Sequence, residues 1–251
     1  MIPVKEKNDF AFSPEVQKEN IKATEKQRLI GEHELDDLRY VFIDKYAYRR
    51  FKRGMDFLIS LLALCVLLVP MLLVAVAIFL DDPGTVIFSQ YRVGRNGKSF
   101  KLYKFRTMKK DTPRYLSTME VDDPDKYITR LGYFLRRSSL DELPQLVNIL
   151  KGDMSLVGPR PLISSEYEIH QMRTKFGVYA VRPGLTGLAQ VNGRDTVSPA
   201  AKVRWDVKYI ECFGFMTDLK IFLATIPKIF GSVGVVEGCT IDMCEDSDTE
   251  S

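Results

Sequence analysis

Two adjacent carboxylates, Asp141 and Glu142, stand at the predicted start of a helix. Proline is tolerated in the first turn of a helix, so Pro144 places the beginning of this helix near Asp141. Free backbone N–H groups and the positive end of the helix dipole would keep a carboxylate ionised there and attract phosphate. The pair could act as nucleophile and metal ligand. It could equally be an N-cap and a solvated first-turn carboxylate, because Asp is common at N-caps.

A second candidate element is Arg160, which lies between Pro159 and Pro161. Proline restricts its own backbone and that of the preceding residue, so the position of Arg160 has little freedom. A guanidinium held in this way is suited to a phosphate or a nucleotide. A purely structural proline-rich turn is the alternative.

Two further stretches supply polar binding groups. The stretch Arg182–Arg194 mixes glycines, a hydroxyl, amides and arginines without a helical or strand period, which predicts a binding loop. Residues 101–108 alternate cationic and aromatic side chains, which would form either a solvated strand face or a second contact to the same anion. Such a basic strand also suits nucleic acid, but the apolar segment described next argues against that partner.

The segment Phe57–Leu80 carries no charged residue and would extend roughly 36 Å as a helix. It is therefore long enough to span a bilayer core of about 30 Å. Pro70 favours a kink instead, and basic residues flank both ends, which favours the cytoplasmic side for both. We therefore expect a re-entrant helix, with a spanning helix as the alternative. The flanking residues are Arg49, Arg50, Lys52 and Arg53 before the segment and Arg92, Arg95, Lys98 and Lys101 after it.

The remaining pattern predicts a small folded domain after this segment. Thr85–Gln90 and Ser99–Met108 are expected to pair as strands around an Asn-Gly turn, and 109–129 is irregular. Helices are predicted from Leu131 onward, one ending at Lys151–Gly152, others over 164–177, 198–212 and Asp218–Phe230. The last of these would lie at the membrane surface or pack in the core.

The expected fold class is α+β: a mainly helical small cytoplasmic domain with a short β-hairpin, anchored by one Pro-kinked re-entrant membrane helix. We divide the chain into a partly disordered N-terminal tail (1–48), the membrane helix (49–82), a catalytic domain (83–231) and an acidic C-terminal tail (232–251).

Three strings, KLYKFRTM, SLDELPQLVNILKGDMSLVGPRP and VRPGLTGLAQVNGR, resemble in this order the bacterial sugar transferase family. These monotopic phosphoglycosyl transferases begin glycan assembly on polyprenyl phosphate. The likeness covers roughly Tyr48 to Gly231. It implies a re-entrant helix, interface-associated helices, a catalytic dyad at Asp141 and Glu142, dependence on Mg²⁺, and nucleotide binding by Pro159-Arg160-Pro161. Many relatives carry Ser-Pro at the membrane break; Val69-Pro70 lacks that hydroxyl, which predicts a shallower kink.

The hypothesis is a two-step transfer at the cytoplasmic face of the bacterial inner membrane. Asp141 attacks a UDP-sugar, UMP leaves, and polyprenyl (undecaprenyl) phosphate takes the sugar phosphate. Glu142, with Asp141, holds Mg²⁺. The product would begin an exopolysaccharide, capsule, O-antigen or glycoprotein glycan, and homo-oligomerisation is left open. The expected substrate contacts are Lys104, Arg106, Thr107, Arg136, Pro159, Arg160, Pro161, Arg182, Gln190, Asn192 and Arg194.

Two other functions fit less of the sequence. An ordinary glycosyltransferase would release UDP; Asp123-Pro124-Asp125 has the spacing of its metal motif but lies in the irregular stretch. A non-enzymatic membrane scaffold would tolerate the loss of Asp141 and Glu142.

Overall fold

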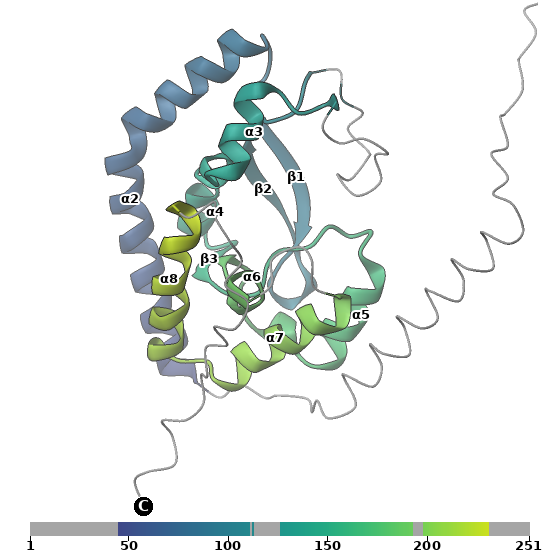
Figure 1. Ribbon diagram of the computed structural model, residues 1–251. Helices are drawn as coiled ribbons and strands as arrows, with labels where there is room; N and C mark the ends of the chain where they lie inside the picture. The colour runs from purple at the N-terminus through teal and green to yellow at the C-terminus, as the bar shows by residue number, and fades with distance from the viewer. Residues whose placement is uncertain (1–44, 111, 113–125, 193–197, 231–251) are drawn as a thin grey trace, which may run out of the picture.

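The computed structural model describes residues 45–110, 112, 126–192 and 198–230 (Figure 1). Most of the predicted N-terminal tail, all of the acidic tail and most of the irregular stretch 109–129 lie outside these residues. The described part is mainly helical, with a two-stranded antiparallel sheet and a two-stranded parallel one. The predicted mixture of helices and a small hairpin is thereby confirmed. The elements are α2 (Tyr46–Asp81), β1 (Ile87–Val93), η1 (Arg95–Gly97), β2 (Ser99–Phe105), α3 (Arg130–Arg137), η3 (Leu140–Glu142), α4 (Gln145–Lys151), β3 (Ser155–Val157), α5 (Tyr167–Lys175), η4 (Val178–Ala180), β4 (Gly184–Thr186), α6 (Leu188–Asn192), α7 (Pro199–Glu211) and α8 (Phe215–Phe230).

Helix α2 is one continuous helix of 36 residues that runs through Pro70. Its length and composition are sufficient to cross a membrane, and it would extend about 54 Å if straight. Figure 1 shows it along one side of the body, bending over toward its C-terminal end. One stripe of the helix packs on the body, while its opposite face is exposed. The packed stripe comprises Ala63, Leu64, Leu67, Met71, Val74, Ala75 and Ile78.

Both ends of α2 are fastened to the same folded body. Near the start, Arg53 donates hydrogen bonds to the carbonyls of Ile149 (2.6 Å) and Leu150 (2.8 Å). One turn later the buried carboxylate of Asp56 accepts from Ser155 Oγ at 2.8 Å and from the N–H of Leu156 at 3.1 Å. At the far end, Ile78 is buried against Phe105 and Leu135, and Arg106 donates to the carbonyl of Asp82.

The predicted hairpin is confirmed, with strands shifted by a few residues. Strands β1 and β2 pair from Ile87↔Phe105 to Val93↔Ser99. Asn96 (φ 57°) and Gly97 (φ 71°) both adopt the left-handed conformation that a tight turn requires. Phe100 and Leu102 of β2 are buried in the core. Lys104 follows them at the spacing of two that places side chains on one face of a strand.

The glycine-rich stretch after Arg182 is not an irregular loop, so that prediction was wrong. It contains β4, which pairs in parallel with β3 through Ser155↔Gly184 and Val157↔Thr186, and then α6. A Cβ atom on Gly184 would lie 2.1 Å from the backbone nitrogen of Gly158. The glycines are therefore required because two backbones touch, and the touching segments carry the Pro159–Pro161 element.

Candidate active site

The Asp141–Glu142 pair lies in the 3₁₀ turn η3, which leads through Leu143 and Pro144 into α4. The turn follows Ser139, whose φ of 56° is left-handed. A helical segment therefore begins where the sequence predicted, but as a 3₁₀ turn. Ser139 and Pro144 occupy the cap positions of η3 and α4. Asp141 caps neither helix, and the capping interpretation of this residue does not hold.

Glu142 is held by two cations. Its Oε1 atom lies 2.7 Å from Lys104 Nζ and 3.2 Å from Arg160 Nη2. Burial alone would raise the pKa of Glu142, but the charges of Arg160 and Lys104 outweigh it and hold the pKa at about 2. Glu142 is therefore ionised at any physiological pH, and it joins the β2 strand to the Pro159–Pro161 element across the site.

Asp141 has the opposite environment although it is the next residue along the chain. Its side chain is buried, with the residue 7% exposed. Its nearest cation is Lys104, 3.7 Å away. Burial raises the pKa of Asp141, Lys104 opposes the rise, and the adjacent charge of Glu142 adds to it. A carboxylate that is poorly solvated and loosely held is more reactive as a nucleophile than one engaged in strong ion pairs.

The backbone of Arg160 is held by a buried ion pair that the sequence analysis missed. Arg173 of α5 donates to the carbonyl of Arg160 at 2.8 Å. Arg173 in turn pairs with Asp206 of α7 at 2.6 Å, and both residues are almost fully buried. The backbone that presents Arg160 is therefore attached to the hydrophobic core. Arg173 and Asp206 are far apart in the sequence and each occupies an ordinary position in a helix, so no local pattern signals them.

Arg92 of β1 is a second residue that the sequence did not single out as a substrate contact. It donates to Gln90 Oε1 at 2.8 Å and to the carbonyl of Pro161 at 3.5 Å. Burial and the nearby charge of Arg160 lower the pKa of Arg92 to about 10. The charge of Arg160 therefore acts on Arg92, and an anion bound between the two would relieve their repulsion. The predicted hairpin was the one sequence feature that could have located Arg92, because it pairs β1 with β2.

The other predicted contacts are distributed among three places. Arg136 donates to Thr107 Oγ1 at 2.9 Å, and its charge acts on Asp141, so both lie beside the dyad. Arg106 binds the end of α2 at Asp82. Gln190 and Asn192 donate to nearby carbonyls, those of Leu185 and Leu188, at 3.1 Å each.

Arg182 lies with a different set of basic residues and donates to the carbonyl of Gly152 at 2.8 Å. Arg194 lies outside the described residues. The structure thus brings together Lys104, Asp141, Glu142 and Arg160, with Arg136 and Thr107 next to them.

The carboxylate pair fits the requirements of a hard divalent cation. Within the described ranges, no group of three or more His, Cys, Asp or Glu side chains is placed to enclose a metal. Mg²⁺ does not need such a cage, because it is often held by one or two carboxylates and the phosphates of its substrate. Burial raises the pKa of Asp141 and the charge of Glu142 adds to the rise, so a cation held beside Asp141 would favour its ionised form.

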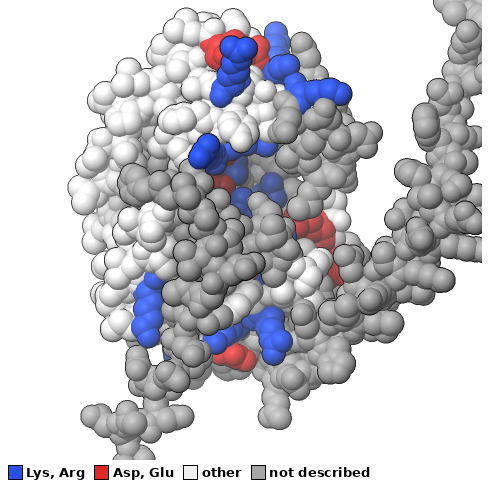
Figure 2. Space-filling model, viewed as in Figure 1, with Lys and Arg blue, Asp and Glu red and all other residues white. Residues whose placement is uncertain are grey.

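The face shown in Figure 2 has basic and acidic side chains together in a hollow near its middle, while the side formed by α2 is uncharged. The exposed apolar residues of that side come from two helices, α2 and α8. They include Leu58, Leu62, Val66, Val69, Leu73, Val76 and Leu80 of α2 and Phe215, Met216, Phe222 and Leu223 of α8.

Comparison with known proteins agrees with the sequence resemblance. A sequence model described as "Bacterial sugar transferase" matches residues 47–232. The exopolysaccharide production protein ExoY of Sinorhizobium fredii is 40% identical over 197 residues, which cover 73% of this chain and 87% of that protein. The UDP-glucose:undecaprenyl-phosphate glucose-1-phosphate transferase of Caulobacter vibrioides is 40% identical over 187 residues, 71% of this chain and 69% of that protein. The UDP-N-acetylgalactosamine-undecaprenyl-phosphate N-acetylgalactosaminephosphotransferase of Aeromonas hydrophila is 38% identical over 192 residues, 74% of this chain and 45% of that protein.

Proposed function

The chain belongs to the bacterial sugar transferase family, and we propose that it transfers a sugar-1-phosphate from a UDP-sugar to undecaprenyl phosphate through a covalent bond to Asp141. The enzyme class agrees with the names of the relatives from Caulobacter and Aeromonas. The observation that supports the covalent route is the contrast within the dyad. Asp141 is buried and weakly paired, whereas Glu142 is bound by two cations.

The first step forms a bond between an Asp141 carboxylate oxygen and the β-phosphorus of the UDP-sugar. The bond from that phosphorus to the bridging oxygen breaks, and its electron pair leaves with UMP. In the second step an oxygen of undecaprenyl phosphate attacks the phosphorus of the aspartyl-phosphosugar. The bond to Asp141 then breaks, which regenerates the carboxylate and yields the diphosphate-linked sugar.

The cations of the site would hold and neutralise the diphosphate. Arg160 can reach a phosphate while its backbone stays fixed by Arg173, and its side chain is 41% exposed, so a substrate can approach it. Arg92 lies next to Arg160 and adds a second guanidinium to the same place. Lys104 spans both carboxylates and would keep them from repelling the approaching diphosphate.

Mg²⁺ is part of the proposal. Asp141 and Glu142 would hold it together with substrate phosphates. The ion would supply charge neutralisation of the diphosphate and of the departing UMP.

A re-entrant arrangement of α2 on the cytoplasmic face of the inner membrane is the topology we favour. A spanning helix would leave its two ends on opposite sides of a bilayer core of about 30 Å. Here Arg53 and Asp56 at one end, and Ile78 and Asp82 at the other, contact one folded body. The exposed apolar faces of α2 and α8 would meet lipid, which brings a lipid phosphate to the level of the dyad.

The test uses two radioactive forms of each UDP-sugar in a panel, without the lipid acceptor. Label at the β-phosphate should become attached to the protein, while label at the α-phosphate should appear in UMP. Asp141→Asn should remove the protein-bound label, and Asp81→Asn, which changes an exposed aspartate at the end of α2, should retain it. Release of UDP on addition of the lipid acceptor, with no protein-bound β-label, would instead identify a glycosyltransferase.

A further inference from the structure

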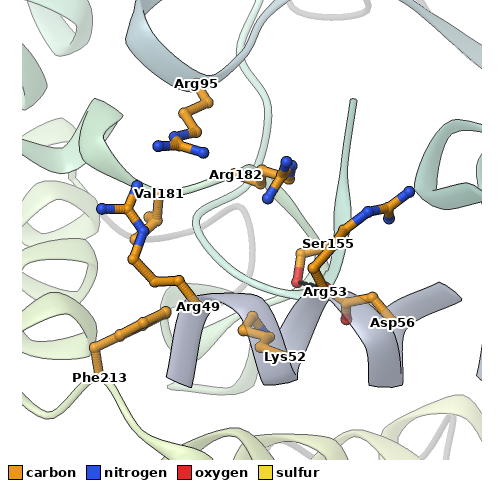
Figure 3. Close-up of a pocket in the computed structure, with 9 residues that line it drawn as sticks. All are labelled: Arg49, Lys52, Arg53, Asp56, Arg95, Ser155, Val181, Arg182 and Phe213. Carbon is orange, nitrogen blue, oxygen red and sulfur yellow. Dashed lines mark hydrogen bonds between the residues drawn. The ribbon is translucent and has the colours of Figure 1, made fainter. Parts of the chain in front are cut away.

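A small pocket at the base of α2 gathers five basic side chains that the proposed reaction does not use. It is lined by Arg49, Lys52, Arg53, Asp56, Arg95, Ser155, Val181, Arg182 and Phe213 (Figure 3). These residues come from α2, the hairpin turn, β3, the segment before β4 and the end of α7. The cavity volume of about 20 Å³ is room for one or two water-sized groups. A nucleoside or a sugar does not fit, but a compact anionic group at the end of a larger molecule does.

Some of the basic side chains are already paired. Lys52 pairs with Asp218, and Arg53 binds the carbonyls of Ile149 and Leu150 at the C-terminal end of α4. Figure 3 shows the guanidinium of Arg53 directed away from those of Arg49, Arg95 and Arg182. Arg49, Arg95 and Arg182 are therefore the remaining basic residues of the lining.

Among the described residues, no acid forms an ion pair with any of these three arginines. Arg49 donates to the carbonyl of Ala180 at 2.9 Å, and Arg182 to that of Gly152. In the described part of the chain the side chain of Arg95 has no hydrogen-bond partner, and its Nε atom is buried and unsatisfied. Burial and then the charges of Arg49 and Arg182 lower the pKa of Arg95.

Asp56, the only acid in the lining, offsets these charges only in part, because among the three it acts on Arg182. Its two oxygens are occupied by Ser155 and Leu156, and the nearest positive charge acting on it is that of Lys52. Arginines grouped with too little negative charge are stabilised by a bound anion, because it supplies the missing charge and the missing hydrogen bonds.

The pocket is separate from the dyad. Asp141 precedes α4, and Gly152, which binds Arg182, follows it. Helix α4, which lies between them, is on the order of 10 Å long, too far for one phosphate to contact both. The pocket also adjoins the place where the charged start of α2 gives way to the apolar residues from Phe57 onward, the level at which lipid headgroups lie.

We propose that Arg49, Arg95 and Arg182 form a phosphate-binding site separate from the active site. Its ligand is a phosphate group, either the phosphodiester of an anionic phospholipid headgroup or a soluble phosphate. Binding there would fasten the hairpin turn and the start of α2 together. The inference does not depend on the proposed reaction, because binding is measured without turnover.

The test is a set of thermal-unfolding and calorimetric titrations of the full chain in a neutral detergent at constant ionic strength. One arm adds inorganic phosphate. The other adds a short-chain phosphatidylglycerol, with short-chain phosphatidylcholine as its zwitterionic counterpart of zero net charge. At least one anion should raise the Tm of the wild type, since a ligand that binds only the folded state stabilises it. Phosphate alone would identify a soluble ligand, and phosphatidylglycerol alone a lipid headgroup.

Three variants locate the binding. Arg95→Gln should weaken it about tenfold or more, whereas Arg95→Lys should retain part of it because the charge remains. Arg204→Gln, which alters an exposed arginine of α7, should bind like the wild type. Arg160→Gln removes an active-site cation and should leave this binding unchanged. The proposal is overturned if neither anion raises the wild-type Tm above the phosphatidylcholine control, or if Arg95→Gln binds as tightly as the wild type.

Discussion

The two carboxylates of the dyad should respond in opposite ways when each is replaced by its amide. Glu142 is ionised and held by Lys104 and Arg160, so Glu142→Gln removes stabilising interactions. The fall in its pKa from 4.5 to about 2 corresponds to about 3 kcal/mol at neutral pH. For a domain of this size the expected loss in Tm is about 6–12 °C.

Asp141→Asn should leave the Tm unchanged or raise it. Burial raises the pKa of Asp141, so folding disfavours its ionised form, and removing that charge relieves the folded state. Sugar-phosphate transfer should nevertheless fall by roughly 10³-fold or more, as expected for a lost nucleophile. Loss of activity with gain of stability is typical of a residue retained for chemistry.

The pH dependence of stability should distinguish the two carboxylates of the dyad in the same way. The contribution of Glu142 is present above its ordinary pKa of 4.5 and is lost as the pH falls toward about 2. The contribution of Asp141 has the opposite sign, because its folded-state pKa is raised and protonation relieves its burial. Both variants should be unfolded thermally in chelator, from pH 3 to 8, with Glu168→Gln, an exposed glutamate of α5, as the control. A destabilised Asp141→Asn with near-wild-type transfer would refute this account of the dyad.

Two further predictions concern the metal and the membrane. Chelation should abolish transfer and Mg²⁺ should restore it, because this ion prefers hard carboxylate and phosphate oxygens as ligands. Transfer is measured as lipid-linked radioactivity. Full activity in excess chelator would contradict the role of metal ligand given to the dyad. With the native cysteines replaced, single cysteines at Arg50 and Lys98, both exposed, should react with a membrane-impermeant reagent only from the cytoplasmic side. If the two cysteines instead react from opposite faces while Pro70 is intact, α2 is a spanning helix. Pro70→Ala should shift labelling at Lys98 toward the opposite side.

The local features of the fold were predictable because short-range chemistry sets them. Asn96 and Gly97 tolerate positive φ, so the turn of the hairpin was found. Gly152, with a φ of 88°, ends α4 where predicted. The helix over Asp218–Phe230 was found as well, although it starts three residues earlier and continues through Pro227.

The long-range features were not predictable from one sequence. The pairing of β3 with β4 joins segments of three residues each, too short for a visible alternation. The glycines of β4 were therefore taken for loop residues, whereas Gly184 is needed where it meets Gly158. Arg182 lies just before β4 and was assigned to the substrate together with that predicted loop. The fold instead places it beside Arg49, at the end of α4 opposite to the dyad.

The arrangement of charge around α4 explains why these two sites are kept apart. A helix favours acids at its N-terminal end and bases at its C-terminal end. Asp141 and Glu142 precede α4, and Arg53 and Arg182 bind the carbonyls at its end. However, α4 has only seven residues, so its dipole and free N–H groups cannot by themselves hold a diphosphate against two carboxylates. The attraction must come from side chains, and Arg160, fixed by Arg173, is the one whose position the core determines. The proposed phosphate binding at the dyad would therefore depend on the packing of α5 against α7, far from it in sequence.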